Sequence, residues 1–240
     1  MISSTNLDAL AVKLQTTSKN VYREYVQHLF LSIFYGQKSS DQILFKGGTA
    51  LRLVFRSPRF SEDLDFSLNQ LNYPLLESTI ENTLVEINRT GLNITLIEAK
   101  PATGGYLALL SCPLGNLNVS LLLQFSSRHH DLLGESTSVS NDFIPLYPIT
   151  ILSKRQLVAE KVQALLSRHK PRDYYDLYFL LRSNLLDTTT KQRLIEIKNL
   201  LSNTTLNLND ELQEYLPKSH WPIIKDFKHV LTQELVRFTR

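Results

Sequence analysis

The octapeptide Arg59-Phe-Ser-Glu-Asp-Leu-Asp-Phe66 alternates polar and apolar side chains towards its C-terminal end. Such alternation predicts a β-strand, because successive side chains of a strand point to opposite faces of the sheet. Asp63 and Asp65 then lie on one face, and Leu64 and Phe66 lie on the other. Two carboxylates on one face repel each other unless a cation neutralises them. We therefore expect Asp63 and Asp65 to bind a metal ion.

The surrounding sequence indicates which metal this would be. No cluster of cysteine or histidine accompanies the two aspartates. Hard oxygen ligands favour Mg²⁺ or Mn²⁺, and such an ion usually completes its coordination shell with substrate phosphates. Phosphoryl and nucleotidyl transfer use metal ions in this way. An Asp-x-Asp pair alone is more often a solvated strand edge, so neighbouring motifs have to support the assignment.

A glycine pair lies between a short apolar segment and the acidic octapeptide. Gln42–Phe45 predicts a buried strand, and Lys46, Gly47 and Gly48 predict a turn after it. Thr49 is a typical N-cap residue and predicts a helix directly behind the turn. Backbone N–H groups at a helix start bind anions, so we expect Lys46, Gly47, Gly48 and Thr49 to contact a triphosphate.

Ser61 lies two positions before Asp63, on the same face of the predicted strand. Its hydroxyl could donate to a phosphate or to a metal-bound water, although a serine in this setting also forms local turns. Each motif alone has a structural explanation. Their occurrence in the order strand, Gly-Gly-Thr, helix, Ser-x-Asp-x-Asp favours a nucleotide site.

A second group of chemically informative residues lies in the C-terminal half. Predicted helices over 152–167 and 172–182 are separated by a short segment, which favours an antiparallel pair. Lys161 and Asp176 would then converge. A lysine neutralises charge on a triphosphate, and Asp176 could position that lysine or help to activate an attacking hydroxyl. An ion pair that joins the two helices explains the same residues equally well.

The net charge of +3 is a weak indication of an anionic partner. Its distribution is more informative, because basic side chains gather in two clusters that include Arg52 and Arg56 in the first and Arg168, Lys170 and Arg172 in the second. Such clusters suit the phosphates of RNA, although a solvated basic face explains each of them as well.

The pattern of apolar residues predicts a mixed α/β half followed by a helical half. Helical spacing covers 7–35 and 74–88, alternation predicts strands over 93–99, 106–112 and 117–125, and helical spacing returns over 190–202, 210–216 and 222–238. Pro145 and Pro148 interrupt both periodicities. We therefore expect an α/β domain with N-terminal helices over residues 1–145 and a helical domain over 146–240.

The single cysteine, Cys112, excludes a disulfide framework or a cysteine zinc site within the chain. No basic patch followed by an apolar core opens the sequence, and no segment is long and apolar enough to span a bilayer. We expect a cytoplasmic protein without a membrane partner.

Taken together, the motifs resemble the AbiEii/AbiGii (MenT-like) toxin family of the nucleotidyltransferase superfamily. They are Lys46-Gly-Gly-Thr-Ala-Leu51, Arg59–Phe66, Glu160-Lys161 with Arg168, and Arg172-Asp-Tyr-Tyr-Asp-Leu-Tyr178. The resemblance implies an α+β fold: a polymerase-β-like core with a mixed sheet, a C-terminal helical region, and an active site in the groove between them. It also implies a toxin of a two-gene toxin–antitoxin or phage-defence system, with a cognate antitoxin, whose relatives modify the tRNA acceptor end.

The resemblance further implies roles for individual residues. By motif position, Ser61 and Asp63 would serve the triphosphate and metal, Asp65 the metal, Lys161 the phosphates and Asp176 catalysis. Arg168 would join the residues that bind the NTP.

The sequence departs from the nucleotidyltransferase pattern in one respect. Many members place a third carboxylate on a later strand, yet residues 117–125 contain none and offer Asn118, Ser120 and Gln124 instead. Either Asp176 compensates for the missing acid or only one metal binds tightly.

Three functions remain open on the sequence alone. The first is Mg²⁺-dependent transfer of a nucleoside monophosphate from an NTP to RNA, with the tRNA 3′ end as the acceptor, which would block translation. The second is transfer to a protein hydroxyl by the same core, since both reactions need an NTP site and an external nucleophile. The third is a non-catalytic nucleotide-binding module.

Overall fold

The computed structural model describes the chain except residues 1, 39, 128–130, 188–189, 205–208 and 240. The chain forms two compact units. Unit 1 comprises Met1–Arg56 and Phe60–Ser153, and unit 2 comprises Ser57–Arg59 and Lys154–Arg240. The short segment Ser57–Arg59 thus belongs to unit 2, although the chain on both sides of it belongs to unit 1.

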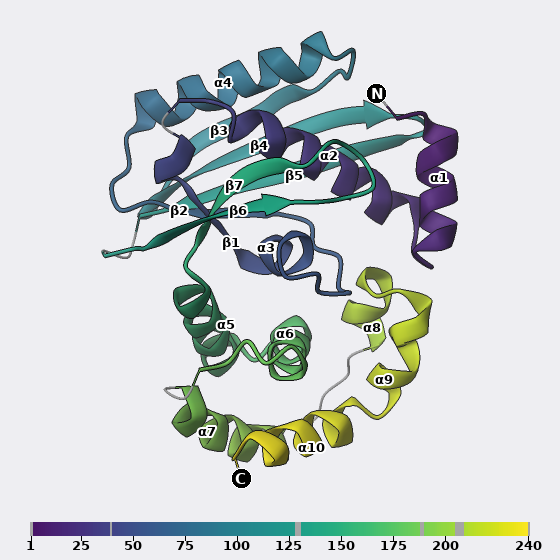
Figure 1. Cartoon of the computed structure of the whole chain (residues 1–240), viewed down its shortest axis with the longest axis vertical. Coiled ribbons are helices and arrows are strands. Elements are labelled where there is room, and N and C mark those ends of the chain that lie inside the picture. Colours follow the sequence, from purple (N-terminus) through teal and green to yellow (C-terminus); the bar gives the residue numbers. More distant parts are fainter. Residues whose placement is uncertain (1, 39, 128–130, 188–189, 205–208, 240) are drawn as a thin grey trace. The chain divides into compact units, whose positions relative to one another are not determined.

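Unit 1 is built on a seven-stranded sheet of order β3-β4-β5-β2-β1-β7-β6 (Figure 1). β2 runs parallel to β5 and β1 parallel to β7, whereas the other neighbours are antiparallel. The predicted mixed sheet is therefore confirmed. The strands are β1 Leu44–Lys46, β2 Leu64–Ser67, β3 Thr95–Ala102, β4 Gly105–Leu114, β5 Leu117–Ser126, β6 Gly134–Val139 and β7 Tyr147–Leu152.

Helices α2 and α4 cover one face of this sheet (Figure 1). The rings of Phe34 on α2 and Phe66 on β2 both contact Phe125 on β5, and Tyr73 on α4 contacts Tyr106, the register partner of Phe125. Alternate residues of β5 that include Asn118, Ser120 and Gln124 must point to the other face. Unit 1 contains α1 Ser4–Lys13, α2 Ser18–Phe34, α3 Gly47–Leu53 and α4 Tyr73–Arg89.

The acidic octapeptide forms a shorter strand than its alternation predicts. β2 contains only Leu64–Ser67, so Asp65 lies in the strand and Asp63 directly precedes it. The amide of Gln27 on α2 donates to the carbonyls of Ser61 and Glu62. These carbonyls are satisfied by a helix side chain rather than by a neighbouring strand, which explains why the ladder begins later.

The predicted glycine turn and threonine cap are wrong. α3 begins at Gly47, which has a φ of 82°, and Gly48 and Thr49 both lie inside the helix. The Thr49 side chain is buried, and its hydroxyl donates to the carbonyl of Asp63 instead of capping the helix.

Two strands, β6 and β7, were missed by the sequence reading. The segment from Leu152 was expected to begin a helix, but Leu152 ends β7 and the helix starts at Lys154. A short apolar run does not distinguish a buried strand from a buried helix, and the prolines hid its alternation. The expected domain boundary after residue 145 lies ahead of β7, whereas the compact units divide after Ser153.

Unit 2 is helical, as predicted. Its helices are α5 Lys154–Arg168, α6 Pro171–Arg182, α7 Lys191–Ser202, α8 Asn209–Leu212, α9 Trp221–Lys225 and α10 Phe227–Thr239. Two predicted helices are shorter than expected: α8 passes into a 3-10 turn over Gln213–Tyr215, and the helix expected over 222–238 is divided at Asp226 into α9 and α10. An apolar core that includes Leu165, Tyr174 and Leu231 holds the unit together. Within the described part of the chain, no helix is long and apolar enough to cross a membrane.

Candidate functional site

Asp63 and Asp65 share the face of the sheet that α2 and α4 leave uncovered. Asp65 lies in register with Lys46 on β1 and with Gln124 on β5. The amide nitrogen Nε2 of Gln124 donates to Oδ2 of Asp63 over 3.2 Å. Register partners point to the same face, so this bond places both carboxylates beside Gln124. The arrangement has the geometry that the alternation in the sequence led us to expect.

Gly47 allows the backbone of α3 to lie directly against Asp65. A Cβ atom at this position would be 2.1 Å from Oδ2 and 2.8 Å from Cβ of Asp65. The φ of 82° is also one that side-chain-bearing residues rarely adopt. Both facts require glycine at position 47, whereas the contact of this motif with a triphosphate stays a prediction.

The other residues of the glycine motif are used differently from one another. Lys46 is half-buried and points to the face of its register partner Asp65, whereas Thr49 is fully buried and holds the Asp63 backbone. Ser61 is half-buried two residues before Asp63. Lys46 therefore lies on the acidic face, and Thr49 supports that face from inside.

The donor set of the acidic pair fits a divalent cation that also binds phosphate. Among the described residues, no group of three or more His, Cys, Asp and Glu side chains comes together. Mg²⁺ commonly uses one or two carboxylates and takes its remaining ligands from water and substrate phosphates. Gln124 lies where a third acid would sit, because it is in register with Asp65 and bonded to Asp63. The set thus consists of two carboxylates and one neutral amide.

Unit 2 brings Lys161 and Asp176 together, as predicted. Lys161 Nζ on α5 lies 2.8 Å from Oδ2 of Asp176 on α6. Arg59 also donates to Asp176, with its Nε 2.9 Å from Oδ1 and its Nη2 3.1 Å from Oδ2. Asp176 is 1% exposed and Arg59 is 5% exposed, so this is a buried carboxylate between two cations.

This environment fixes the charge of Asp176. Burial alone would raise its pKa, but the charges of Arg59 and Lys161 and their hydrogen bonds outweigh burial and lower the pKa. The carboxylate is therefore ionised near neutral pH, and both of its oxygens already accept bonds. Such a group holds Lys161 in place. Its saturated oxygens do not favour a role as a metal ligand, so the structure offers no support for Asp176 as the missing third acid.

Arg168 and Asp173 form a second ion pair at the end of the same helix hairpin. Arg168 Nε and Nη2 lie 2.8 Å and 2.6 Å from the two oxygens of the buried Asp173. The backbone N–H of Lys170 donates to the same carboxylate. Together with the Lys161–Asp176 contact, these bonds show that α5 and α6 are antiparallel. Arg168 joins the two helices, while Lys170 remains exposed at the turn.

The basic residues predicted to contact RNA differ in how they are held. Arg52 pairs with the buried Glu24 over 2.6 Å and stacks over the ring of Phe60 at 3.9 Å. Arg56 is exposed in unit 1, and Arg172 is half-buried in unit 2 with its Nε 3.8 Å from Glu211. Arg52 therefore forms an ion pair inside unit 1, whereas Arg56 lies at the surface, where it can contact RNA.

Sequence reasoning undervalued two residues of these sites. Arg59 was considered only as the first residue of the acidic octapeptide, and Gln124 only as a residue that stands where related enzymes have an acid. The alternation of polar and apolar residues in β5 could have indicated that Gln124 lies on the same face of the strand as Asn118 and Ser120. The partnership of Arg59 with Asp176 joins positions 117 apart in the sequence, and no local pattern reveals it.

Comparisons with known proteins identify the family and the fold. Residues 30–234 match the family model described as nucleotidyl transferase AbiEii toxin of type IV toxin–antitoxin systems. The solved structure of MenT4, a nucleotidyltransferase toxin from Mycobacterium tuberculosis, is similar over 100% of this chain and 90% of that one, with a TM-score of 0.68 and 15% identity.

Two structures from Helicobacter pylori are also similar. One, described as a nucleotidyltransferase, covers 93% of this chain and 96% of its own at a TM-score of 0.66 and 16% identity. JHP933 covers 93% of each chain at a TM-score of 0.63 and 16% identity. No curated protein matches the sequence. At these identities the structural matches show a shared fold.

Proposed function

This chain belongs to the AbiEii family of nucleotidyl transferase toxins of type IV toxin–antitoxin systems, and from that premise we propose that it transfers a nucleoside monophosphate from an NTP to the 3′ end of a tRNA. The product would be a tRNA that can no longer be aminoacylated correctly, so translation would stop. The toxin would act in the cytoplasm, and a cognate antitoxin would limit its effect.

The observation that carries the proposal is the acidic pair on the face of the sheet opposite α2 and α4. Asp63 and Asp65 would hold Mg²⁺, which supplies charge neutralisation for the triphosphate and the attacking hydroxyl. Gln124 orients the Asp63 carboxylate by its amide bond. Gly47 brings the backbone close enough to Asp65 to limit how far that carboxylate can turn.

Lys161 keeps the role that the family resemblance implies, as a cation for the phosphates. Its ammonium group is held by Asp176, so its position is fixed before substrate binds. Pre-organised charge of this kind stabilises a transition state without reorganisation during the reaction. We therefore regard Asp176 as a positioning residue rather than a proton acceptor.

An RNA acceptor is supported by the basic side chains at the surface of each unit. Arg56, Lys170 and Arg172 would contact backbone phosphates, which account for much of the affinity of proteins for nucleic acids. The same chemistry with a protein hydroxyl as the acceptor would not need these residues. Substitution of these residues should therefore weaken transfer to tRNA and leave transfer to a protein unchanged, which distinguishes the two acceptors.

The test is incubation of the purified protein with total tRNA, Mg²⁺ and each α-³²P-labelled NTP in turn, followed by a denaturing gel. Asp63→Asn keeps the shape of the side chain and removes the charge, so we expect labelling of tRNA to fall below detection. Glu86→Gln, a change of the same type at an exposed position of α4, should label normally.

The outcomes are distinct. Label on tRNA that requires Asp63 would establish the reaction, its nucleotide and its acceptor class. Label that resists RNase and is lost to protease in a lysate would replace tRNA by a protein acceptor. Retention of labelling by Asp63→Asn would remove the metal assignment.

A further inference from the structure

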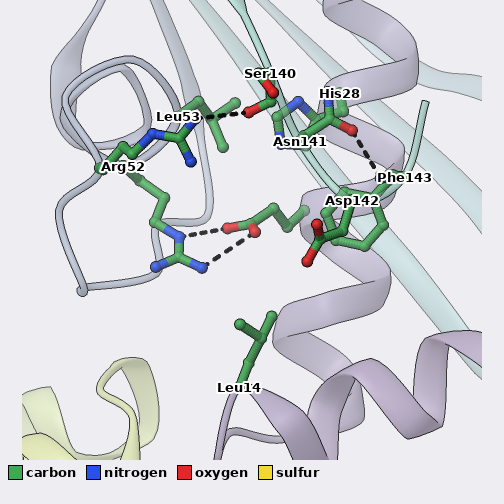
Figure 2. A pocket seen from close by; sticks show the side chains of 10 residues that line it. Leu14, His28, Arg52, Leu53, Ser140, Asn141, Asp142 and Phe143 are labelled. Carbon is green, nitrogen blue, oxygen red and sulfur yellow. Dashed lines mark hydrogen bonds and ion pairs between the residues drawn. The ribbon is translucent and has the colours of Figure 1, made fainter. Parts of the chain in front are cut away.

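A pocket of about 240 Å³ lies in unit 1 at the opposite end of α3 from the acidic pair (Figure 2). Gly47 at the start of α3 touches Asp65, whereas Leu53 at its end lines the pocket. Six residues of helix separate these positions, which corresponds to roughly 9 Å along the axis. The pocket is therefore separate from the acidic pair but within a few nucleotides of it.

The charges in the pocket nearly cancel. Arg52 is paired with Glu24, and the Asp142 carboxylate lies 3.3 Å from Lys13. His28 also lines the pocket, but burial and the charge of Arg52 lower its pKa to about 3, so it is neutral. Its Nδ1 shares a 2.8 Å hydrogen bond with the hydroxyl of Tyr147. Apart from Arg56 at the edge, a free anion would find little net attraction here, so an uncharged polar group is favoured inside the pocket.

Asn141 offers a hydrogen-bond donor in this pocket. Its Oδ1 accepts from the backbone N–H groups of Phe143 and Ile144, which fixes the side chain in a turn. Its Nδ2 is buried and has no hydrogen-bond partner within the part of the chain that the structure describes. A buried donor without a partner costs free energy, so a ligand that accepts from it would recover that cost.

Arg56 supplies a second polar contact at the edge of the pocket. Its Nη2 donates to the carbonyl of Ser140, and a guanidinium has five N–H donors, so this bond leaves donors for a ligand. Arg56 has a φ of 62°, an uncommon conformation for a residue with a side chain. Figure 2 shows Arg52 on one side of the pocket and the segment Ser140–Phe143 on the other.

We propose that this pocket binds one nucleobase, with Asn141 Nδ2 donating to an acceptor atom on the base edge and Arg56 contacting the attached phosphate. The volume is below the roughly 300–1,000 Å³ of pockets for drug-sized ligands, which suits a single base rather than a whole nucleotide. Phe143 provides an aromatic wall, as in many sites for unstacked bases. The proposal rests on the nucleotidyl transfer proposed above and adds a recognition site to it.

A base in this pocket could come from the acceptor RNA or from the NTP, and the experiment separates these sources. Asn141→Asp keeps the oxygen that accepts from Phe143 and Ile144 and replaces the donor by an acceptor. Combined with Asp142→Asn, it leaves the net charge of the pocket unchanged. Binding of unfractionated tRNA and of each NTP would be measured by equilibrium titration with the double variant and with the unaltered protein, which has the same net charge.

We expect the double variant to bind one of the two ligand classes about 5–20-fold more weakly than the unaltered protein, because a hydrogen bond to a buried donor is lost. Weaker tRNA binding assigns the base to the acceptor, and weaker NTP binding assigns it to the nucleotide. Unchanged binding of both would overturn the proposal. These titrations do not depend on turnover, so they remain decisive if no transfer to tRNA is found.

A second variant guards against local misfolding of the turn. Arg56→Gly removes the guanidinium at a position where the positive φ suits glycine, so the fold should tolerate it. Arg89→Ala removes an equally charged, exposed side chain elsewhere in unit 1 and serves as the control. Arg56→Gly should weaken binding of the same ligand class as the Asn141 variant, and equal binding by Arg56→Gly and Arg89→Ala would contradict the site.

Discussion

The two units use buried or half-buried aspartates in opposite ways. In unit 1, Asp63 accepts a hydrogen bond from the neutral amide of Gln124 and lies with Asp65 on the face of the sheet opposite α2 and α4. In unit 2, Asp176 is enclosed by the cations of Arg59 and Lys161. The charge of Asp176 holds these two cations, whereas we propose that the charges of Asp63 and Asp65 bind a metal ion. The partners of each aspartate, more than the residue type, indicate its role.

The largest effect on transfer should come from Gly47→Ala, which disturbs the acidic pair of unit 1 and leaves the buried cluster of unit 2 unchanged. The new methyl group would meet the Asp65 carboxylate and force it to move. We expect transfer to fall by about 10²–10³-fold, because misplacement by about 1 Å already costs about 10²-fold. Single-turnover rates with labelled NTP measure this effect.

Gly91→Ala is the matched control, since Gly91 has a φ of 90° and carries similar backbone strain away from the site. Gly91→Ala measures the cost of the positive φ alone, so Gly47→Ala should lose at least as much stability in thermal unfolding. Equal activity of the two would mean that contact with Asp65 does not matter.

The next effect should come from Asp176→Asn, which breaks the cluster of unit 2. Two buried cations would lose their counter-charge, so we expect a loss of about 3–5 kcal/mol in the free energy of unfolding. Transfer should fall about 10²-fold because Lys161 loses its support. Chemical denaturation and steady-state kinetics measure the two effects separately.

Glu234→Gln provides the comparison, because Glu234 is also a nearly buried carboxylate between two arginines, Arg182 and Arg237. It should lose stability and keep transfer activity. If both variants lost activity equally, the effect of Asp176→Asn would be one of folding only.

The ion pairs of Asp176 with Arg59 and Lys161 predict a pH dependence of stability. The pKa of Asp176 is lowered in the folded state, so its stabilising effect is present above the ordinary aspartate pKa of about 3.9 and is lost as the pH falls through the lower folded value. Unfolding free energies measured between about pH 5 and pH 2 should therefore fall less steeply in Asp176→Asn than in the unaltered protein. Parallel slopes would contradict the assigned charge.

A smaller change should follow from Gln124→Glu, which makes the acidic site of unit 1 more like that of related enzymes with three acids. A third carboxylate in register with Asp65 should bind a divalent cation about 10-fold more tightly. Titration with Mn²⁺, followed by electron paramagnetic resonance, measures this without substrate. Gln124→Met removes the amide without adding charge and should not tighten binding, and equal affinities in the two variants would exclude Gln124 from the metal site.

The smallest effect should come from Thr49→Val, which removes the hydroxyl that holds the Asp63 carbonyl. We expect a loss of about 1–2 kcal/mol in unfolding free energy and a few-fold loss of transfer. Thr83→Val, at an equally buried threonine of α4, should cost stability without affecting transfer. If Thr49→Val retained full activity, its bond to Asp63 would be structural only.

The sequence predicted features that depend on local periodicity. The shared face of Asp63 and Asp65 follows from alternation, and the helices of unit 2 follow from apolar spacing. The strand β7 was missed because its alternation is masked by Pro148 and its apolar end resembles a helix start. The start of α3 at Gly47 was missed because the preference of Thr49 for helix caps yielded to its bond with Asp63. Local preference fails where a distant partner decides the conformation.

The segment Ser57–Arg59 has a consequence for synthesis of the protein on the ribosome. Arg59 is made long before its partner Asp176, because 117 positions separate them. At about 5–20 residues per second, the ribosome needs roughly 6–25 s to cover that interval. During this time Arg59, four residues from Asp63, lacks the carboxylate that later holds it. The buried cluster of unit 2 therefore cannot form until α6 has been synthesised, so this unit reaches its folded state late in translation of the chain.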